Sequence, residues 1–461
     1  MPPIPVPFDQ ALRIASEDEQ AGRLDEAERL LGTILHTVPG QPDALHTMGL
    51  VAFRRGRVAE AADLIERAAQ NGASAGLASR NLCTIYERLG RIDEAIAAGR
   101  RAIEANPDDP HACVNLSVAC YRALQLDDSI ALARRAIRLD PSLAAAHFAL
   151  AEPLLLRGAF AEGWEEYEWR FRLGSQPRMM PQTDRPHWTG AAMPDSTLLL
   201  VADQGFGDVI QFCRYLPWVV SRCPHLAIAC SPELRPLLLQ VAPDAALFER
   251  WEACPSFAAY CPLSGLPRLH GTRLDTIPSP GAYLRADAGL AAAWAMRLDR
   301  LLPAGYRRVG LVWAGRAAHP NDGNRSATLH DLEPLGRLHR TALVSLQKGP
   351  PQVQAGRYFG PAPLLNAAAE LRTFEDTASV LAHLDLLVTV DTGVAHLAAA
   401  MGKPVWMMLP FAPDWRWLLD RTDSPWYPSL RLFRQPTSRR WDLVVARIVA
   451  ELSSRASPRL P

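Results

Sequence analysis

Lysine is nearly absent from this chain of 461 residues, since only Lys348 and Lys403 stand among its 49 basic side chains and the others are arginines. Acidic side chains also number 49, so the formal net charge is zero and nothing in it favours nucleic acid or a membrane surface as a partner. The charge is unevenly spread, because residues 1–173 hold 25 acidic and 19 basic side chains and the rest holds 24 and 30. An anionic small ligand would therefore favour the second part.

Cysteine pairs and long apolar runs are missing as well. The eight cysteines are scattered without a C-x-x-C pair, so neither a zinc knuckle nor a redox couple is indicated. No uncharged run approaches the roughly 18–20 residues of a spanning helix, and the N-terminus lacks the basic and apolar regions of a leader peptide. We therefore expect a cytoplasmic protein without a transmembrane segment, folded into roughly three compact units.

A period of 34 residues runs through the first part of the chain. Glycine stands at positions 22, 56, 90 and 158, and Leu124 fills the missing phase. Five positions after each comes a residue small enough for two helices to touch: Ala27, Ala61, Ala95, Ser129 and Gly163. A helix–turn–helix unit of this length resembles the tetratricopeptide repeat, and five copies fit between residues 9 and 173.

Repeat arrays of this kind commonly hold a peptide or protein in a concave groove. The alternative is a spacer or an arm that forms a homodimer. Polar residues of the first helices are candidates to line the groove: Asn81, Asn115 and His147. Aromatic residues close the last repeat and would dock it on the following unit: Trp164, Tyr167, Trp169 and Phe171.

Residues 174–195 are rich in proline and polar side chains without a sustained period, which indicates a linker. Strand and helix patterns then alternate, with strands expected at Leu386–Val390 and Val405–Leu409 among others. Alternation of this kind predicts parallel sheets covered by helices, here in two Rossmann-like lobes, 196–305 and 306–455. The expected fold is thus an all-α solenoid followed by an α/β unit whose lobes face each other across a cleft.

The segment LLVTVDTGVAHLAAAMGKP (386–404) places a turn between a strand and a small-residue helix. Free N–H groups at the start of such a helix, with Gly393 allowing close approach, suit a phosphate. The local pattern equally fits Thr392 or Asp391 as an ordinary helix cap, with His396 as a packed first-turn residue.

Two further strand ends of this lobe carry cationic or donor groups. Gly315 and Arg325 lie in the loop after one strand, and Lys348 follows the next. Because parallel strands end at one edge, we expect these groups to converge with the 391–396 turn on one anion. Residues 410–428 hold four aromatic side chains, and an aromatic plug between the lobes is favoured there over sugar stacking.

The first lobe offers the loop DQGFGDVIQF, with Gln204, Gly205 and Gly207 before or beside Asp208. This is not a G-x-G-x-x-G fingerprint, and an acid at that place would repel a pyrophosphate. An acid facing the cleft is well placed to take a proton from an attacking hydroxyl. The alternative is that Asp208 only neutralises the start of its own helix.

Two segments resemble the paired motifs of the bacterial heptosyltransferase-like glycosyltransferases of family 9, which have the two-lobed GT-B fold: GFGDVIQFCRYLP and VTVDTGVAHLAAAMGKPVW. This resemblance covers about residues 195–450. The layout of repeats followed by such a unit is also similar to that of protein O-GlcNAc transferase and of flagellin-modifying glycosyltransferases.

The resemblance implies a metal-independent, inverting transfer from a nucleotide-diphosphate sugar to an acceptor hydroxyl, with no cofactor. Asp208 matches the family's proposed base, and Thr392, Gly393 and His396 match its donor-diphosphate turn. Asp391 would support the turn by hydrogen bonding, and Lys348 is a weaker match on the donor side.

The acceptor is expected to be a protein or peptide on the repeats, because heptosyltransferases of the lipopolysaccharide pathway lack a repeat array. Two alternatives stay open. One is a non-catalytic repeat scaffold with a degenerate GT-B unit, and the other is an enzyme of glycolipid or polysaccharide synthesis.

Overall fold

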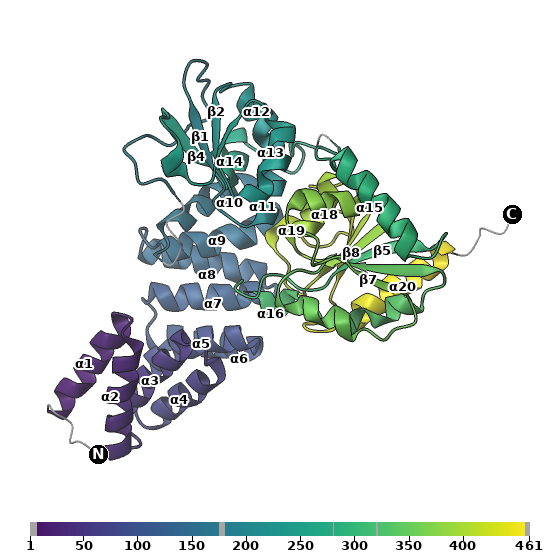
Figure 1. Cartoon of the computed structure of the whole chain (residues 1–461). Coiled ribbons are helices and arrows are strands. Elements are labelled where there is room, and N and C mark those ends of the chain that lie inside the picture. Colours follow the sequence, from purple (N-terminus) through teal and green to yellow (C-terminus); the bar gives the residue numbers. More distant parts are fainter. Residues whose placement is uncertain (1–6, 175–179, 280, 320, 457–461) are drawn as a thin grey trace. The chain divides into compact units, whose positions relative to one another are not determined.

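The computed structural model describes residues 7–174, 180–279, 281–319 and 321–456 (Figure 1). Contacts divide the chain into two compact units, Met1–Leu154 and Leu155–Pro461. The first is all-helical, and the second contains two parallel sheets with helices, as the sequence predicts. The division falls inside a helix, so the second helix of the fifth repeat belongs to the second unit by its contacts.

Helices pair in sequence order along the repeats. Their bounds are α1 (Phe8–Gln20), α2 (Leu24–Thr37), α3 (Pro42–Arg54), α4 (Val58–Gln70), α5 (Ala75–Leu89), α6 (Ile92–Ala105), α7 (Pro110–Arg122), α8 (Leu126–Leu139), α9 (Ala144–Arg157) and α10 (Phe160–Tyr167). The small residues predicted at the helix crossings are buried, and Ala27, Ala61, Ala95 and Ser129 have no exposed surface. A methyl group on Gly163 would lie 2.7 Å from Cδ2 of Leu155, which explains the glycine in the last pair.

The turns inside the pairs share one backbone conformation. Gly22, Gly56, Gly90 and Gly158 have φ between +76° and +87°. Leu124 takes the equivalent place with φ +59°, a left-handed conformation that a side chain disfavours. The fourth turn therefore keeps the geometry of the array at some cost in backbone strain.

The amides predicted to line a groove join neighbouring repeats. Nδ2 of Asn81 lies 2.9 Å from Nε2 of His46, and Nδ2 of Asn115 donates to the carbonyl of Arg80 at 3.1 Å. His147 donates from Nε2 to the carbonyl of Pro141 at 3.0 Å. These contacts fix the register between or within repeats, and a partner groove stays a prediction.

The second unit contains two parallel sheets. The strands are β1 (Leu198–Val201), β2 (Leu226–Ala229), β3 (Ala246–Phe248), β4 (Ala259–Pro262), β5 (Arg307–Val312), β6 (Thr341–Ser345), β7 (Leu364–Asn366), β8 (Leu386–Val390), β9 (Val405–Leu409) and β10 (Leu430–Arg434). The strand order is β3-β2-β1-β4 in the first sheet and β10-β9-β8-β5-β6-β7 in the second. In the described part of the chain, these strands pair with one another in parallel, as the alternating pattern predicts.

Helices cover both sheets. Their bounds are α11 (Phe206–Phe212), α12 (Leu216–Val220), α13 (Arg235–Val241), α14 (Leu266–His270), α15 (Ala288–Leu301), α16 (Asp322–Arg325), α17 (Leu329–Leu332), α18 (Phe374–Leu381), α19 (Gly393–Ala400) and α20 (Trp441–Ala456). In the second sheet, side chains such as Val309 and Val388 share one core with Ile448 of α20. Figure 1 shows α15 and α18 on the other side of this sheet, so both of its faces are covered, which suits its continuous apolar strands.

Part of the expected linker is ordered against the first sheet, although its residues 175–179 lie outside the described residues. His187 bridges to Tyr260 of β4, and the N–H of Trp188 donates to the carbonyl of Tyr260 at 2.8 Å. The Tyr260 hydroxyl also lies 2.8 Å from Nε2 of His187. The segment thus covers an edge strand that would otherwise leave its polar groups unpaired.

Helix α10 docks through aromatic side chains, as the sequence predicts. The ring centroid of Trp164 lies 5.1 Å from that of Trp415, and Phe160 stacks on Trp426 at 6.1 Å. Trp415, Trp417, Trp426 and Tyr427 are each at most 2% exposed, so the 410–428 segment forms an aromatic plug. The contacts of α10 explain why it belongs to the second unit.

The eight cysteines are all free and buried, in line with their scattered spacing. Burial raises the pKa of Cys83 and of Cys213 to about 12, which keeps both thiols protonated. Among the described residues, no helix has the length and apolar character needed to cross a membrane.

Candidate functional site

The carboxyl ends of three neighbouring strands, β9, β8 and β5, carry the polar groups of the candidate site. Thr392 occupies the N-cap position of α19, but its side chain makes no capping hydrogen bond. Its Oγ1 lies instead 3.2 Å from Oγ1 of Thr389. Thr392 therefore does not provide a side-chain cap at the start of α19, which was one form of the alternative to an anion site.

Asp391 is held by two side chains of its own lobe. Its Oδ2 accepts a hydrogen bond from the indole N–H of Trp417 at 2.8 Å, and its Oδ1 lies 3.7 Å from Nε2 of His396. Burial alone raises the pKa of Asp391, but His396, Trp417 and Arg325 outweigh it and lower the pKa to about 2. Asp391 thus stays ionised and fixes the turn.

His396 lies on the buried side of α19 and is only 4% exposed. Its Nδ1 is 2.9 Å from the hydroxyl of Tyr427, and its Nε2 faces Asp391. Both ring nitrogens therefore have protein neighbours. The structure places His396 behind the turn that it was expected to form.

Arg325 and Gly315 come together in the loop after β5. Nη1 of Arg325 donates to the carbonyl of Asp391 at 3.3 Å, which brings the guanidinium to the 391–393 turn. A methyl group on Gly315 would lie 2.6 Å from Nη2 of Arg325 and 2.8 Å from Oδ1 of Asp322. A side chain at position 315 would therefore have to displace the guanidinium of Arg325 or the carboxylate of Asp322.

His319 of the same loop was not singled out by the sequence. The residue is exposed, yet neighbouring protein atoms partly desolvate the imidazole. This desolvation and Arg325 lower the pKa of His319, against the opposing effect of three carboxylates, those of Asp414, Asp391 and Asp208. Its Nδ1 accepts the N–H of Asn321 at 3.1 Å. Because the arginine and the three carboxylates all act on this imidazole, His319 lies close to the other groups of the site.

Lys348, the weaker match on the donor side, makes two hydrogen bonds within its own lobe. Its Nζ donates to the carbonyls of Ala368 at 2.8 Å and Leu371 at 2.7 Å, so the ammonium holds the loop after β7. The neighbouring Gln347 is 2% exposed, and its Oε1 accepts the N–H groups of Trp313 and Ala314, both at 2.9 Å. These residues support the strand ends from behind.

The loop of the first lobe lies directly against α19. A methyl group on Gly207 would be 2.8 Å from Cδ2 of His396 and 3.5 Å from Cα of Gly393. Gln204 donates from Nε2 to the hydroxyl of Tyr167 at 3.0 Å, which ties the loop to α10. A methyl group on Gly205 would lie 3.2 Å from Oδ2 of Asp208, so glycine keeps that oxygen uncrowded.

Asp208 stands in the first turn of α11, and its side chain is 24% exposed. Its Oδ1 accepts a hydrogen bond from Nη2 of Arg416, a residue of the loop after β9 in the other lobe. The sequence does not indicate this ion pair, because Arg416 stands within the aromatic-rich segment 410–428. Nothing in the spacing of positions 208 and 416 could have indicated it.

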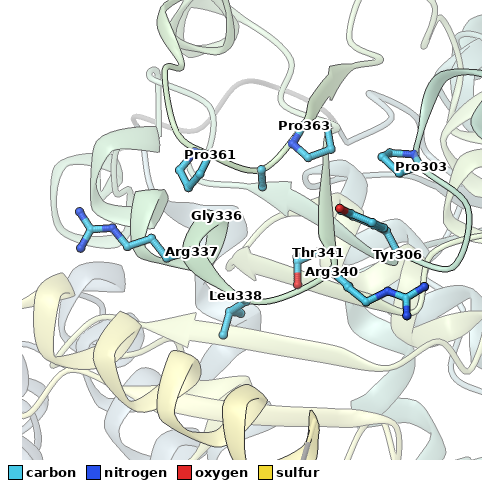
Figure 2. A pocket seen from close by; sticks show the side chains of 10 residues that line it. Pro303, Tyr306, Gly336, Arg337, Leu338, Arg340, Thr341, Pro361 and Pro363 are labelled. Atoms are coloured by element: carbon cyan, nitrogen blue, oxygen red, sulfur yellow. The ribbon is translucent and has the colours of Figure 1, made fainter.

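A surface hollow of about 500 Å³ lies elsewhere on the second lobe (Figure 2). Its lining includes Tyr306 before β5 and Thr341 at the start of β6, so it sits at the amino ends of the strands. Figure 2 shows the side chains of Arg337 and Arg340 extending in different directions. The hollow thus lacks converging polar groups and is separate from the candidate site.

Comparisons with known proteins find similarities to both the repeats and the second unit. Residues 12–76 and 46–110 match the tetratricopeptide repeat family. Residues 364–407, which run from β7 to β9 and include the 391–396 turn, match glycosyltransferase family 9 (heptosyltransferase). Protein FlbA of Caulobacter vibrioides is 28% identical over 342 residues, which cover 68% of this chain and 56% of FlbA. The chain therefore spans little more than half the length of that relative.

Solved structures resemble the repeats. YrrB, described as a tetratricopeptide repeat protein with an unusual peptide-binding site, is 19% identical with a TM-score of 0.30, over 35% of this chain and 84% of its own. MamA from Desulfovibrio magneticus is 19% identical with a TM-score of 0.31, over 36% of this chain and 92% of its own.

Proposed function

We propose that this chain, a tetratricopeptide repeat array fused to a glycosyltransferase family 9 unit, transfers a sugar from a nucleotide-diphosphate donor to an acceptor hydroxyl. The comparisons support a glycosyltransferase-like protein, and the substrates and mechanism are our proposal. One observation carries it. The loop that presents Asp208 touches the uncapped N-terminus of α19, with the N of Gly207 only 3.4 Å from where a methyl group on Gly393 would lie.

The donor diphosphate would bind at the start of α19. Free N–H groups at Gly393 and the positive end of the helix dipole favour a negatively charged ligand. Arg325 adds a cation at this place, because its guanidinium contacts the carbonyl of Asp391. Together they supply charge for a leaving diphosphate, and the proposed mechanism uses no metal ion.

The reaction would be an in-line displacement that inverts the anomeric carbon. Asp208 takes the proton of the acceptor hydroxyl while the acceptor oxygen bonds to the anomeric carbon. The bond from that carbon to the donor phosphate oxygen breaks, and the electron pair leaves with the nucleoside diphosphate. The α19 N-terminus and Arg325 stabilise charge that grows on the leaving group, so they act most strongly in the transition state.

The other predicted site residues take supporting roles in this proposal. His396 and Asp391 hold the turn in place, and Thr392 with Gly393 forms it. Lys348 is not included among the donor ligands, because two of its N–H groups bind backbone carbonyls. On the acceptor side, Gln204 anchors the loop and Gly205 leaves space at Oδ2 of Asp208.

The acceptor would be a protein or peptide held by the repeats. Tetratricopeptide repeats typically bind proteins, and the family match covers the first repeats of this chain. A glycolipid acceptor would leave the array without a role in the reaction. The repeats are therefore the support for a protein substrate.

The test is a panel of uridine, guanosine and adenosine diphosphate sugars against the full chain. Bound donor should raise the melting temperature by mass action, and release of nucleoside diphosphate should report turnover with water or an acceptor. Arg325→Gln should weaken donor binding at least tenfold, whereas Arg316→Gln, an exposed arginine of the same loop, should not.

Asp208→Asn should remove turnover while leaving donor affinity within about twofold of the wild type, because the amide cannot accept the proton. Turnover that survives in this variant would exclude Asp208 as the base. Donor binding without turnover under any condition would support the alternative of a non-catalytic scaffold.

A further inference from the structure

Arg416 is the point at which the donor lobe reaches the proposed base. Its guanidinium donates from Nη2 to Oδ1 of Asp208, from Nη1 to both oxygens of Asp414 at 2.9 and 3.0 Å, and from Nε to Oε1 of Gln211 at 2.5 Å. Asp208 and Gln211 belong to α11 of the first lobe, whereas Asp414 lies in the same loop as Arg416. One arginine thus joins two carboxylates from opposite lobes.

The surroundings of Arg416 fix its position. The side chain is 7% exposed, and its guanidinium carbon lies 4.1 Å from the centroid of the Trp415 ring. Burial opposes the charge, but Asp414 and Asp208 raise the pKa of Arg416 well above its ordinary value, so it remains a cation. Leu418 takes φ +52° just after the 415–417 turn, a strained conformation that surrounding packing must maintain.

The ion pair leaves the two oxygens of Asp208 in different environments. Oδ1 is occupied by Arg416, while Oδ2 lies beside Gly205, where the loop is exposed. A planar guanidinium fixes the orientation of a carboxylate better than an ammonium can, because it presents several donors in one plane.

We propose that Arg416 is a positioning residue of the transfer reaction: it orients Asp208 from the opposite lobe so that Oδ2 is the oxygen that receives the acceptor proton. This assignment rests on the proposed function. It also means that the base is correctly placed only when the loop after β9 is docked on α11, so donor and acceptor sides are assembled together.

Charged groups near Asp208 should affect how the rate of turnover depends on pH, and this dependence can be measured. The titratable groups that act near it are Arg416 and Asp414 from the loop after β9, Tyr167 from α10, and His319 from the loop after β5. His396 lies against the same loop through Gly207. A neighbouring cation favours an ionised carboxylate and a neighbouring anion disfavours it.

Three variants separate orientation from charge. Arg416→Gln removes the cation, so the acid limb of the kcat profile should move to higher pH, with kcat reduced about 100-fold. Arg416→Lys keeps the charge but loses the planar geometry, so kcat should fall while the limb moves less. Asp414→Asn removes the competing anion, and the limb should move to lower pH.

Controls distinguish this role from a structural one. Arg421→Lys, in an exposed pair with Asp423, should leave both the rate and the profile unchanged. The KM for the donor should stay within about twofold of the wild-type value in all variants. Addition of 10–100 mM guanidinium should raise the kcat of a well-folded Arg416→Ala chain about tenfold, which is a partial recovery. Melting curves with and without donor show whether each variant is folded.

The outcomes separate this assignment from the proposed function. A wild-type chain without turnover, or an Asp208→Asn chain with unchanged turnover, overturns both. Turnover that needs Asp208 but keeps the same acid limb in Arg416→Gln and Asp414→Asn overturns only the role of Arg416. Shifts in opposite directions for these two variants support it, since a merely structural contact would lower the rate without moving the profile.

Discussion

The indole N–H of Trp417 donates to Oδ2 of Asp391 across 2.8 Å, and this bond joins the loop after β9 to the turn after β8. Trp417 has no exposed surface, so the bond is shielded from water. The turn of the proposed donor site is thereby held by a residue 26 positions further along the chain.

Trp417→Phe should destabilise the second unit because it leaves the ionised Asp391 without this donor. Trp313→Phe is the matched control, since Trp313 is equally buried and its Nε1 has no partner among the described residues. Both changes shrink a ring, but only the first breaks a hydrogen bond to a charge. We expect Trp417→Phe to cost roughly 1–3 kcal/mol more in urea unfolding, and equal losses would contradict this account.

Asp391→Asn should destabilise the fold at neutral pH by an amount on the order of 1–2 kcal/mol. The pKa of Asp391 is lowered to about 2 from 3.8, so its ionised form stabilises the native state above about pH 4, and that contribution is lost as the pH falls toward 2. The difference in melting temperature between the two chains should therefore shrink on acidification. A gap that stays constant from pH 7 to pH 3 would rule out this origin.

Gly207→Ala should force the loop of Asp208 away from α19, because the new methyl group would lie 2.8 Å from Cδ2 of His396. Neither partner is free to retreat, so we expect a loss of about 1–3 kcal/mol and a fall in turnover. Gly356→Ala is the control, since no atom lies within 4 Å of the added methyl group. Thermal unfolding and nucleotide release measure the two effects, and a neutral Gly207→Ala would refute the contact.

Leu124→Gly should stabilise the repeats by up to about 1 kcal/mol, since relief of the left-handed leucine exceeds the entropy cost of glycine. The reverse change, Gly56→Leu, should lower stability, because Gly56 has φ +77° although there is space for a side chain. The melting temperature of the all-helical unit in the full chain reports both. A lower value for Leu124→Gly would show that the leucine side chain matters more than its backbone.

Periodicity and apolar runs in the sequence predict much of this fold. The 34-residue spacing predicts the paired helices, because each turn needs the same left-handed residue at the same phase. The strands Leu386–Val390 and Val405–Leu409 are found at the predicted residues, since both are short buried runs between clear breaks. β10 (Leu430–Arg434) was not predicted, because charged residues interrupt its apolar pattern.

Sequence patterns predict the side-chain contacts of the site less well. The pattern places Asp208, Arg325 and Asp391 at strand ends, and the fold brings those ends together. It does not reveal that Lys348 turns to backbone carbonyls or that Arg416 reaches Asp208. Those contacts depend on rotamers and on loop paths between elements far apart in sequence, and no periodicity encodes them.

The contacts of α10 limit which repeats can be gained or lost during evolution. Phe160 and Trp164 pack on Trp426 and Trp415, so this helix is part of the second compact unit rather than a removable repeat. Upstream repeats contact mainly their neighbours, and gene duplication or loss there would lengthen or shorten the array without disturbing those aromatic contacts. Truncations meant to isolate the second unit should therefore begin before α10, and chimaeras that exchange arrays should join the two sequences upstream of it.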